Sequence, residues 1–103
     1  MKTTTIALLA LLMTACLCEE QTKQRAISPD GKWTATYIER DCGATAAYVA
    51  RVEIDRKVVL IVETPSLSLA WRSNSELVVR TRDPMRVFEQ NSHPHVRVLL
   101  NPR

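Results

Sequence analysis

Short runs of alternating apolar and polar residues occur along most of this chain, and this two-residue period limits the fold more than any other feature. Such alternation is typical of a β-strand with one buried face. Trp33, Ala35 and Tyr37, for example, alternate with polar neighbours. No segment after the first sixteen residues has the pattern of an amphipathic helix. Six or seven short strands are therefore predicted, within residues 33–38, 47–54, 58–62, 66–72, 77–82, 85–89 and 95–100.

The connections between these runs are short and polar. Ser28-Pro29-Asp30-Gly31 suits a type I turn, with proline at its second position and glycine at its fourth. Residues 58–62 are apolar on both faces, as in a central strand. Since short connections favour antiparallel neighbours, the sequence predicts an all-β fold, either an antiparallel meander or a small sandwich.

The first sixteen residues have the pattern of an export signal. Lys2 is followed by an apolar stretch at residues 6–13, which is too short to span a membrane, and then by small residues up to Cys16. Residues 13–16 resemble a bacterial lipobox, in which the cysteine is diacylated and starts the mature chain. Met13 departs from the leucine usual there, and an ordinary signal peptidase could instead cut after Ala15. Both alternatives place the protein outside the cytoplasm.

This interpretation divides the chain into a signal peptide (residues 1–15), a lipidated cysteine with a polar tether (residues 16–25) and a single β domain (residues 26–103). Removing residues 1–15 from the 103-residue chain leaves 88 residues, so a cross-link or a partner would help to stabilise a small core. Because Lys2 is lost with the signal, 13 basic side chains remain against 11 acidic ones. This balance does not favour nucleic acid as a partner.

Three cysteines raise the question of a disulfide. If Cys16 carries lipid, Cys18 and Cys42 remain as an even pair in an oxidising compartment. They could form one disulfide, or Cys42 could be a buried thiol and Cys18 an unpaired one.

A catalytic role for Cys42 is the main alternative to a structural one. His93 or His95 could serve as its base, and Asp41 or Asp83 could orient that base. No known local signature surrounds the cysteine, so a structural or disulfide role is favoured. The two histidines could also suggest a metal site, but no third ligand is identifiable. The sequence therefore predicts no catalytic residue, metal or cofactor.

Basic and aromatic side chains are the remaining candidates for binding. The last three predicted strands carry four arginines that could contact anionic lipid headgroups, lipopolysaccharide phosphates or an acidic partner: Arg80, Arg82, Arg86 and Arg97. The alternative is a solvated sheet face paired with nearby carboxylates. Four aromatic residues fit inward-facing positions, while Phe88 is undecided: Trp33, Tyr37, Tyr48 and Trp71.

Several motifs resemble those of a group of small uncharacterised bacterial envelope proteins. These are the SPDG turn at residues 28–31, the hexapeptide RDCGAT at residues 40–45, Trp71, and the segment at residues 86–88. The resemblance covers most of the mature domain, although this chain is shorter between Ile54 and Leu67. Residues 28–33 and 69–79 are also similar to parts of one blade of the Tol-Pal-type periplasmic propellers, but one chain of this length cannot close a propeller. The resemblance implies a fold and a location, and no activity.

Together these features predict a non-catalytic binding or accessory module in the bacterial envelope. It would face the periplasm, with the membrane as its partner through lipid on Cys16, or with another envelope protein as a partner. Without the lipid it would be soluble in the periplasm or secreted. The alternatives are a thiol-dependent enzyme or redox protein centred on Cys42, and an inhibitor or immunity protein of the envelope.

Overall fold

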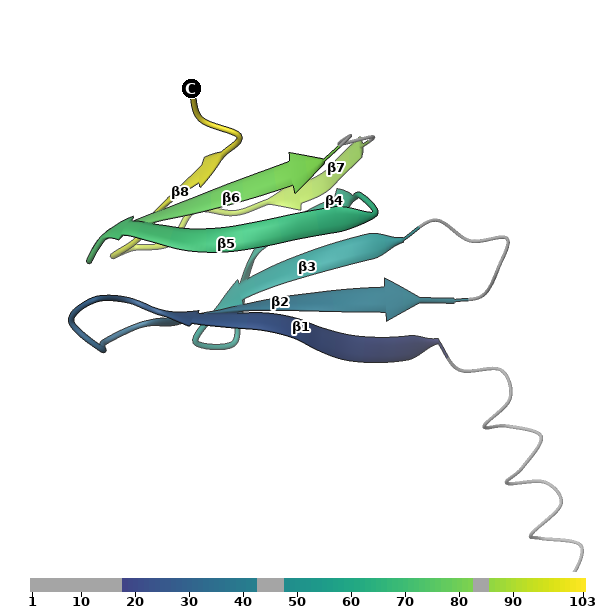
Figure 1. Cartoon of the computed structure of the whole chain (residues 1–103), viewed down its shortest axis with the longest axis horizontal. Coiled ribbons are helices and arrows are strands. Elements are labelled where there is room, and N and C mark those ends of the chain that lie inside the picture. The colour runs from purple at the N-terminus through teal and green to yellow at the C-terminus, as the bar shows by residue number, and fades with distance from the viewer. Residues whose placement is uncertain (1–17, 43–47, 83–85) are drawn as a thin grey trace, which may run out of the picture.

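The computed structural model describes residues 18–42, 48–82 and 86–103, which form eight β-strands and no helix (Figure 1). The strands are β1 (Glu19–Ile27), β2 (Thr34–Asp41), β3 (Val49–Ile54), β4 (Lys57–Glu63), β5 (Ser66–Ser73), β6 (Glu76–Arg82), β7 (Arg86–Gln90) and β8 (Arg97–Leu100). The all-β prediction is confirmed, with one strand more than the alternation indicates.

The strands form two sheets, which lie over one another as two layers (Figure 1). The five-stranded sheet has the order β1-β2-β3-β4-β7 and is antiparallel throughout. The three-stranded sheet has the order β5-β6-β8, in which β8 runs parallel to β6. The prediction of antiparallel neighbours is wrong for β8. After β6 the chain forms β7 in the five-stranded sheet, and it then re-enters the three-stranded sheet as β8, parallel to β6. The architecture is thus a sandwich.

The predicted alternation fills the space between the sheets. On β3, Ala50, Val52 and Ile54 are fully buried, and β4, β5 and β6 contribute leucine and valine side chains from both layers. β4 lies between β3 and β7, as its double-sided apolar pattern predicts. Tyr48 differs from its predicted inward position, since it is 49% exposed. It lies just before β3, at the end of the strand pair and beyond the buried core.

The N-terminal boundary of the domain is a correction to the sequence-based division. Residues 19–25, predicted as part of a polar tether, belong to β1, which pairs with β2 from Glu19 opposite Asp41 to Ile27 opposite Thr34. β1 is an edge strand whose residues are mostly exposed. Its backbone hydrogen bonds, and not an apolar pattern, hold it in place, so hydrophobic periodicity could not reveal it. Within the described residues, the domain extends from Cys18, and the stretch from Glu19 onward is part of the sheet.

Side chains join β1 to β5 and so link the edges of the two sheets. The Gln24 amide donates to the Leu69 carbonyl at 2.9 Å and accepts from the Leu69 N–H at 2.9 Å, as a backbone neighbour would. The Trp71 indole donates to the Ala26 carbonyl at 2.8 Å. A register shift next to Lys23 accompanies this contact. One side of the sandwich is therefore held by hydrogen bonds that no sheet ladder supplies.

The turn between β1 and β2 confirms the prediction at residues 28–31. The Gly31 N–H donates to the Ser28 carbonyl at 2.8 Å, and Gly31 has φ of 77°, which explains the glycine. The buried Ser28 hydroxyl donates to Asp30 at 2.7 Å, and this bond lowers the pKa of the Asp30 carboxyl. The Asp30 N–H donates to the Asn74 side chain at 2.9 Å, which ties this turn to the β5–β6 turn.

Replacing Gln24 with alanine is expected to lower the free energy of unfolding by about 2 kcal/mol, since two hydrogen bonds of about 1 kcal/mol each are lost. Urea unfolding followed by tryptophan fluorescence measures this change. Gln21→Ala is the matched control, because Gln21 is an exposed glutamine on the same strand. Equal effects of the two substitutions would show that Gln24 does not link the sheets.

Candidate functional sites at the two ends of the sandwich

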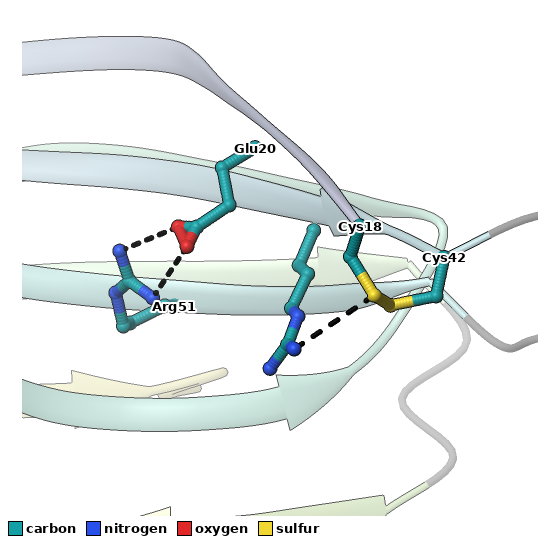
Figure 2. Close-up of a disulfide and its surroundings, with 5 residues drawn as sticks. Cys18, Glu20, Cys42 and Arg51 are labelled. Carbon is teal, nitrogen blue, oxygen red and sulfur yellow. Dashed lines mark hydrogen bonds and ion pairs between the residues drawn. A yellow bond between two sulfur atoms is a disulfide. The ribbon is translucent and has the colours of Figure 1, made fainter. Parts of the chain in front are cut away.

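A disulfide joins Cys18 to Cys42 at one end of the sandwich (Figure 2). Because Glu19 lies opposite Asp41 in the β1–β2 pair, the residues just outside this pair also meet. Their Cα atoms are 4.3 Å apart, across a sequence separation of 24. Of the two alternatives that the sequence leaves open, the structure has the disulfide.

Charged side chains reinforce the same end across the strands. Arg51 on β3 donates to Glu20 on β1 at 2.9 Å (Figure 2). It also donates to Glu53, on its own strand, at 2.7 Å. The hydrogen bond to Glu20 is the main cause that raises the pKa of the Arg51 guanidinium. Arg40 on β2 lies 3.8 Å from the Cys18 sulfur. The end of β1 is thus held covalently to β2 and by an ion pair to β3.

The structure does not bring Cys42 together with the histidines considered as its catalytic base. Its sulfur is bonded to Cys18, and both histidines lie against Trp33, at the other end of β2. The eight residues of β2 lie between Trp33 and Cys42, which puts the two about 30 Å apart along the extended chain. Neither His93 nor His95 can therefore act as a base for Cys42 in this fold. Asp83 lies outside the described residues.

The far end carries a cluster of three rings. The Trp33 ring lies edge-on to His93 at 5.1 Å between centroids and stacks with His95 at 5.5 Å. The His95 N–H donates to Nδ1 of His93 at 3.1 Å, so this nitrogen carries no proton. Burial, followed by the positive charge of Lys57, lowers the pKa of His93. The cluster packs the 91–96 segment against the start of β2.

An open pocket of about 620 Å³ lies beside these rings. It is formed by Ser75 of the β5–β6 turn, by Glu76 at the start of β6, and by residues 90–98, including both histidines. Glu76 on its wall pairs with Arg72 at 3.1 Å, and this hydrogen bond lowers the pKa of the Glu76 carboxyl. Residues 18–42, 48–82 and 86–103 contain no group of three or more His, Cys, Asp or Glu side chains placed to hold a metal.

The four candidate arginines fall on two different sheets. Leu77 and Val79 point into the core, so Arg80 and Arg82 lie on the outer face of the three-stranded sheet. Arg97 shares that face, opposite Glu76. Arg86 instead lies on β7 of the five-stranded sheet, with its guanidinium 5.7 Å from the Phe88 ring centroid.

Sequence reasoning missed two residues of functional interest. Arg72 is exposed on β5 and adds a fourth arginine to the three-stranded sheet. The alternation could have predicted this position, because Leu67, Leu69 and Trp71 face inward and the residue after them therefore faces outward. Gln24 gave no such signal, because its role depends on Leu69, 45 residues away.

Comparison with known proteins gives no match to a family model, to a curated protein or to a solved structure. The resemblance to small bacterial envelope proteins and to propeller blades therefore stays a prediction. The export signal and Cys16 lie outside the described residues. Within the part of the chain that is described, no helix is long and apolar enough to span a membrane.

Replacing both Cys18 and Cys42 with serine is expected to lower the free energy of unfolding by about 3 kcal/mol, because the disulfide closes a loop of 24 positions. Urea unfolding measures the difference, and the wild-type protein under reducing conditions is the control. Alkylation of Cys42 in the folded, unreduced protein would contradict the disulfide.

Stability is expected to depend on pH through His93. Because its pKa in the folded protein lies below the ordinary value of 6.5, the unfolded chain binds more protons between these two values. The stabilisation is complete above pH 6.5 and is lost as the pH falls toward the folded pKa. Urea unfolding at pH 7.5 and 5.5 should show a smaller decrease for His93→Gln than for wild type. The same decrease in both proteins would exclude His93 as the cause.

Proposed function

We propose that this protein is a small lipoprotein of the bacterial envelope, whose β-sandwich is a non-catalytic binding or accessory module facing the periplasm. The observation that carries the proposal is the position of the disulfide. Cys18 is bonded to the end of β2 and lies two positions after Cys16. A lipid on Cys16 would therefore be about 7 Å of chain from a covalently fixed point of the domain.

This arrangement changes what the anchor would do. A flexible tether of ten residues would let the domain turn freely, whereas β1 begins at Glu19 and is paired from its first residue. The lipid would hold the disulfide end of the sandwich against the membrane surface. The ring cluster and the open pocket at the opposite end would then point into the periplasm, where a partner can reach them.

The bonding of Cys42 also supports a binding role over the thiol-enzyme alternative. A thiol nucleophile must be free to form a thiolate. Cys42 is bonded to Cys18, and the imidazoles that could have served as its base lie at the other end of β2. The proposed function accordingly relies on surfaces, and not on a reacting side chain.

Intact mass spectrometry of the protein extracted from membranes tests the anchor. The expected chain starts at Cys16, carries acyl chains and has two hydrogens fewer than the reduced form. Cys16→Ser should abolish the acyl mass. Cys18→Ser is the matched control, which should keep the acyl chains and lose the disulfide.

Two outcomes would contradict the proposal. An unmodified soluble chain starting at Cys16 would exclude the lipid anchor. Rapid alkylation of Cys42 at neutral pH in the unreduced protein would instead support the thiol-dependent enzyme.

A further inference from the structure

The two sheets differ in their balance of acidic and basic side chains. On the five-stranded sheet, Lys23 pairs with Glu39 at 3.8 Å, and Arg51 pairs with two carboxylates. The three-stranded sheet carries four arginines and one acidic residue, Glu76. Within the described part of the chain, only Arg72 of these arginines forms an ion pair, and its partner is Glu76. The outer face of this sheet therefore has an excess of positive charge.

Arg80 and Arg82 are the most closely spaced members of this set. Both are exposed on β6, two residues apart on one face, which separates their Cα atoms by about 7 Å. Ser68 lies directly opposite Arg80 on β5, and Ser66 lies opposite Arg82. Cross-strand neighbours are about 5 Å apart, so these two arginines and two serines form one compact array of backbone positions on the outer face of the sheet.

The array leaves several side-chain donors exposed. Arg80 donates from Nη1 to the Pro102 carbonyl at 3.2 Å. Pro102 follows β8, which lies on the opposite side of β6 from β5, so this bond directs the Arg80 guanidinium away from Ser68 while its other N–H groups stay available. Arg82, Ser66 and Ser68 are exposed as well, so their side chains can also reach a ligand on this face.

The array lies at the disulfide end of the sandwich. The end of β2 at Arg40 pairs with Val49, and Val49 pairs with Glu63 at the end of β4. The next residue, Thr64, donates its hydroxyl to the Arg82 carbonyl at 2.9 Å. Under the proposed function, this is the end that the lipid on Cys16 holds near the membrane.

From this placement we infer that Arg80, Arg82, Ser66 and Ser68 form a binding site for phosphate groups of membrane lipids. Guanidinium groups bind phosphate oxygens through paired N–H donors, and serine hydroxyls can donate to the same oxygens. A flat, exposed array can reach groups displayed on a surface without enclosing them. The inference deepens the proposed binding function by naming the face and the ligand chemistry, and the choice of a lipid source rests on that proposal.

Titration of the protein purified from cells in its processed form tests the site. The ligands are a short-chain phosphatidylglycerol, inorganic phosphate and an uncharged short-chain diacylglycerol, added in a neutral detergent and followed by calorimetry. Wild type is expected to bind phosphatidylglycerol and not the diacylglycerol. Arg80→Gln/Arg82→Gln should weaken this binding at least about tenfold, because the charged donors to the phosphate are lost.

The control variant is Arg25→Gln/Lys57→Gln, which removes the same charge from exposed positions of the five-stranded sheet. It should bind within about twofold of wild type, and Arg80→Lys/Arg82→Lys should lose part of the affinity. Unfolding midpoints equal to that of wild type show that each variant is folded.

The outcomes separate the possible sources of the ligand. No binding of either phosphate compound by wild type, or an equal loss in the control variant, would overturn the inference. Inorganic phosphate binding as tightly as the lipid would support a phosphate site and assign it to soluble phosphate. If mass spectrometry finds no acyl chain, the same titration still reports on the site, so failure of the anchor and failure of the site are distinguishable.

Discussion

The antiparallel pairing of β1 with β2 is the constraint on which the rest of the structure depends. It places Cys18 opposite Cys42, so the disulfide can close, and it presents Gln24 and Ala26 to the edge of β5. Apolar contacts between the two sheets do not by themselves specify how the sheets align. The side-chain amide of Gln24 helps to fix the position of β1 relative to β5, because it hydrogen-bonds both the N–H and the C=O of a single residue, Leu69. A polar edge strand thus determines how the two layers align.

Charge is distributed unevenly over this sandwich, and the distribution follows the sheets. Ion pairs cross the strands of the five-stranded sheet and reinforce the disulfide end, as the contacts of Arg51 show. The three-stranded sheet has a single carboxylate, at Glu76, and it is paired with Arg72. Arg80 and Arg82 lie far along β6 from this pair and keep most of their donors exposed. The strands of the five-stranded sheet are therefore close to balanced in charge, whereas those of the three-stranded sheet carry an excess of positive charge.

Much of the fold was predictable because the alternation of apolar and polar residues is a pattern of neighbouring residues, which the sequence shows directly. Ala50, Val52 and Ile54 are buried as predicted, and the SPDG turn forms with Gly31 at positive φ. β1 was not predictable, because a polar edge strand depends on backbone bonds to β2 and leaves no hydrophobic pattern. The direction of β8 was missed because it depends on the path through β7. The alternation predicts an inward position for Tyr48, but this side chain is exposed because it lies beyond the end of the core.

By itself, the sequence determined the positions of the strands from β2 onward, the turns and the even pair of cysteines that remains once Cys16 is set aside. These features are local, since each depends on the chemistry of neighbouring residues or on a count. Only the tertiary structure decided that Cys18 meets Cys42, that His93 and His95 lie far from Cys42, and that Arg82 is near the disulfide end while Arg86 is on the other sheet. Such relations require strand order and register, which are set by contacts between residues distant in sequence.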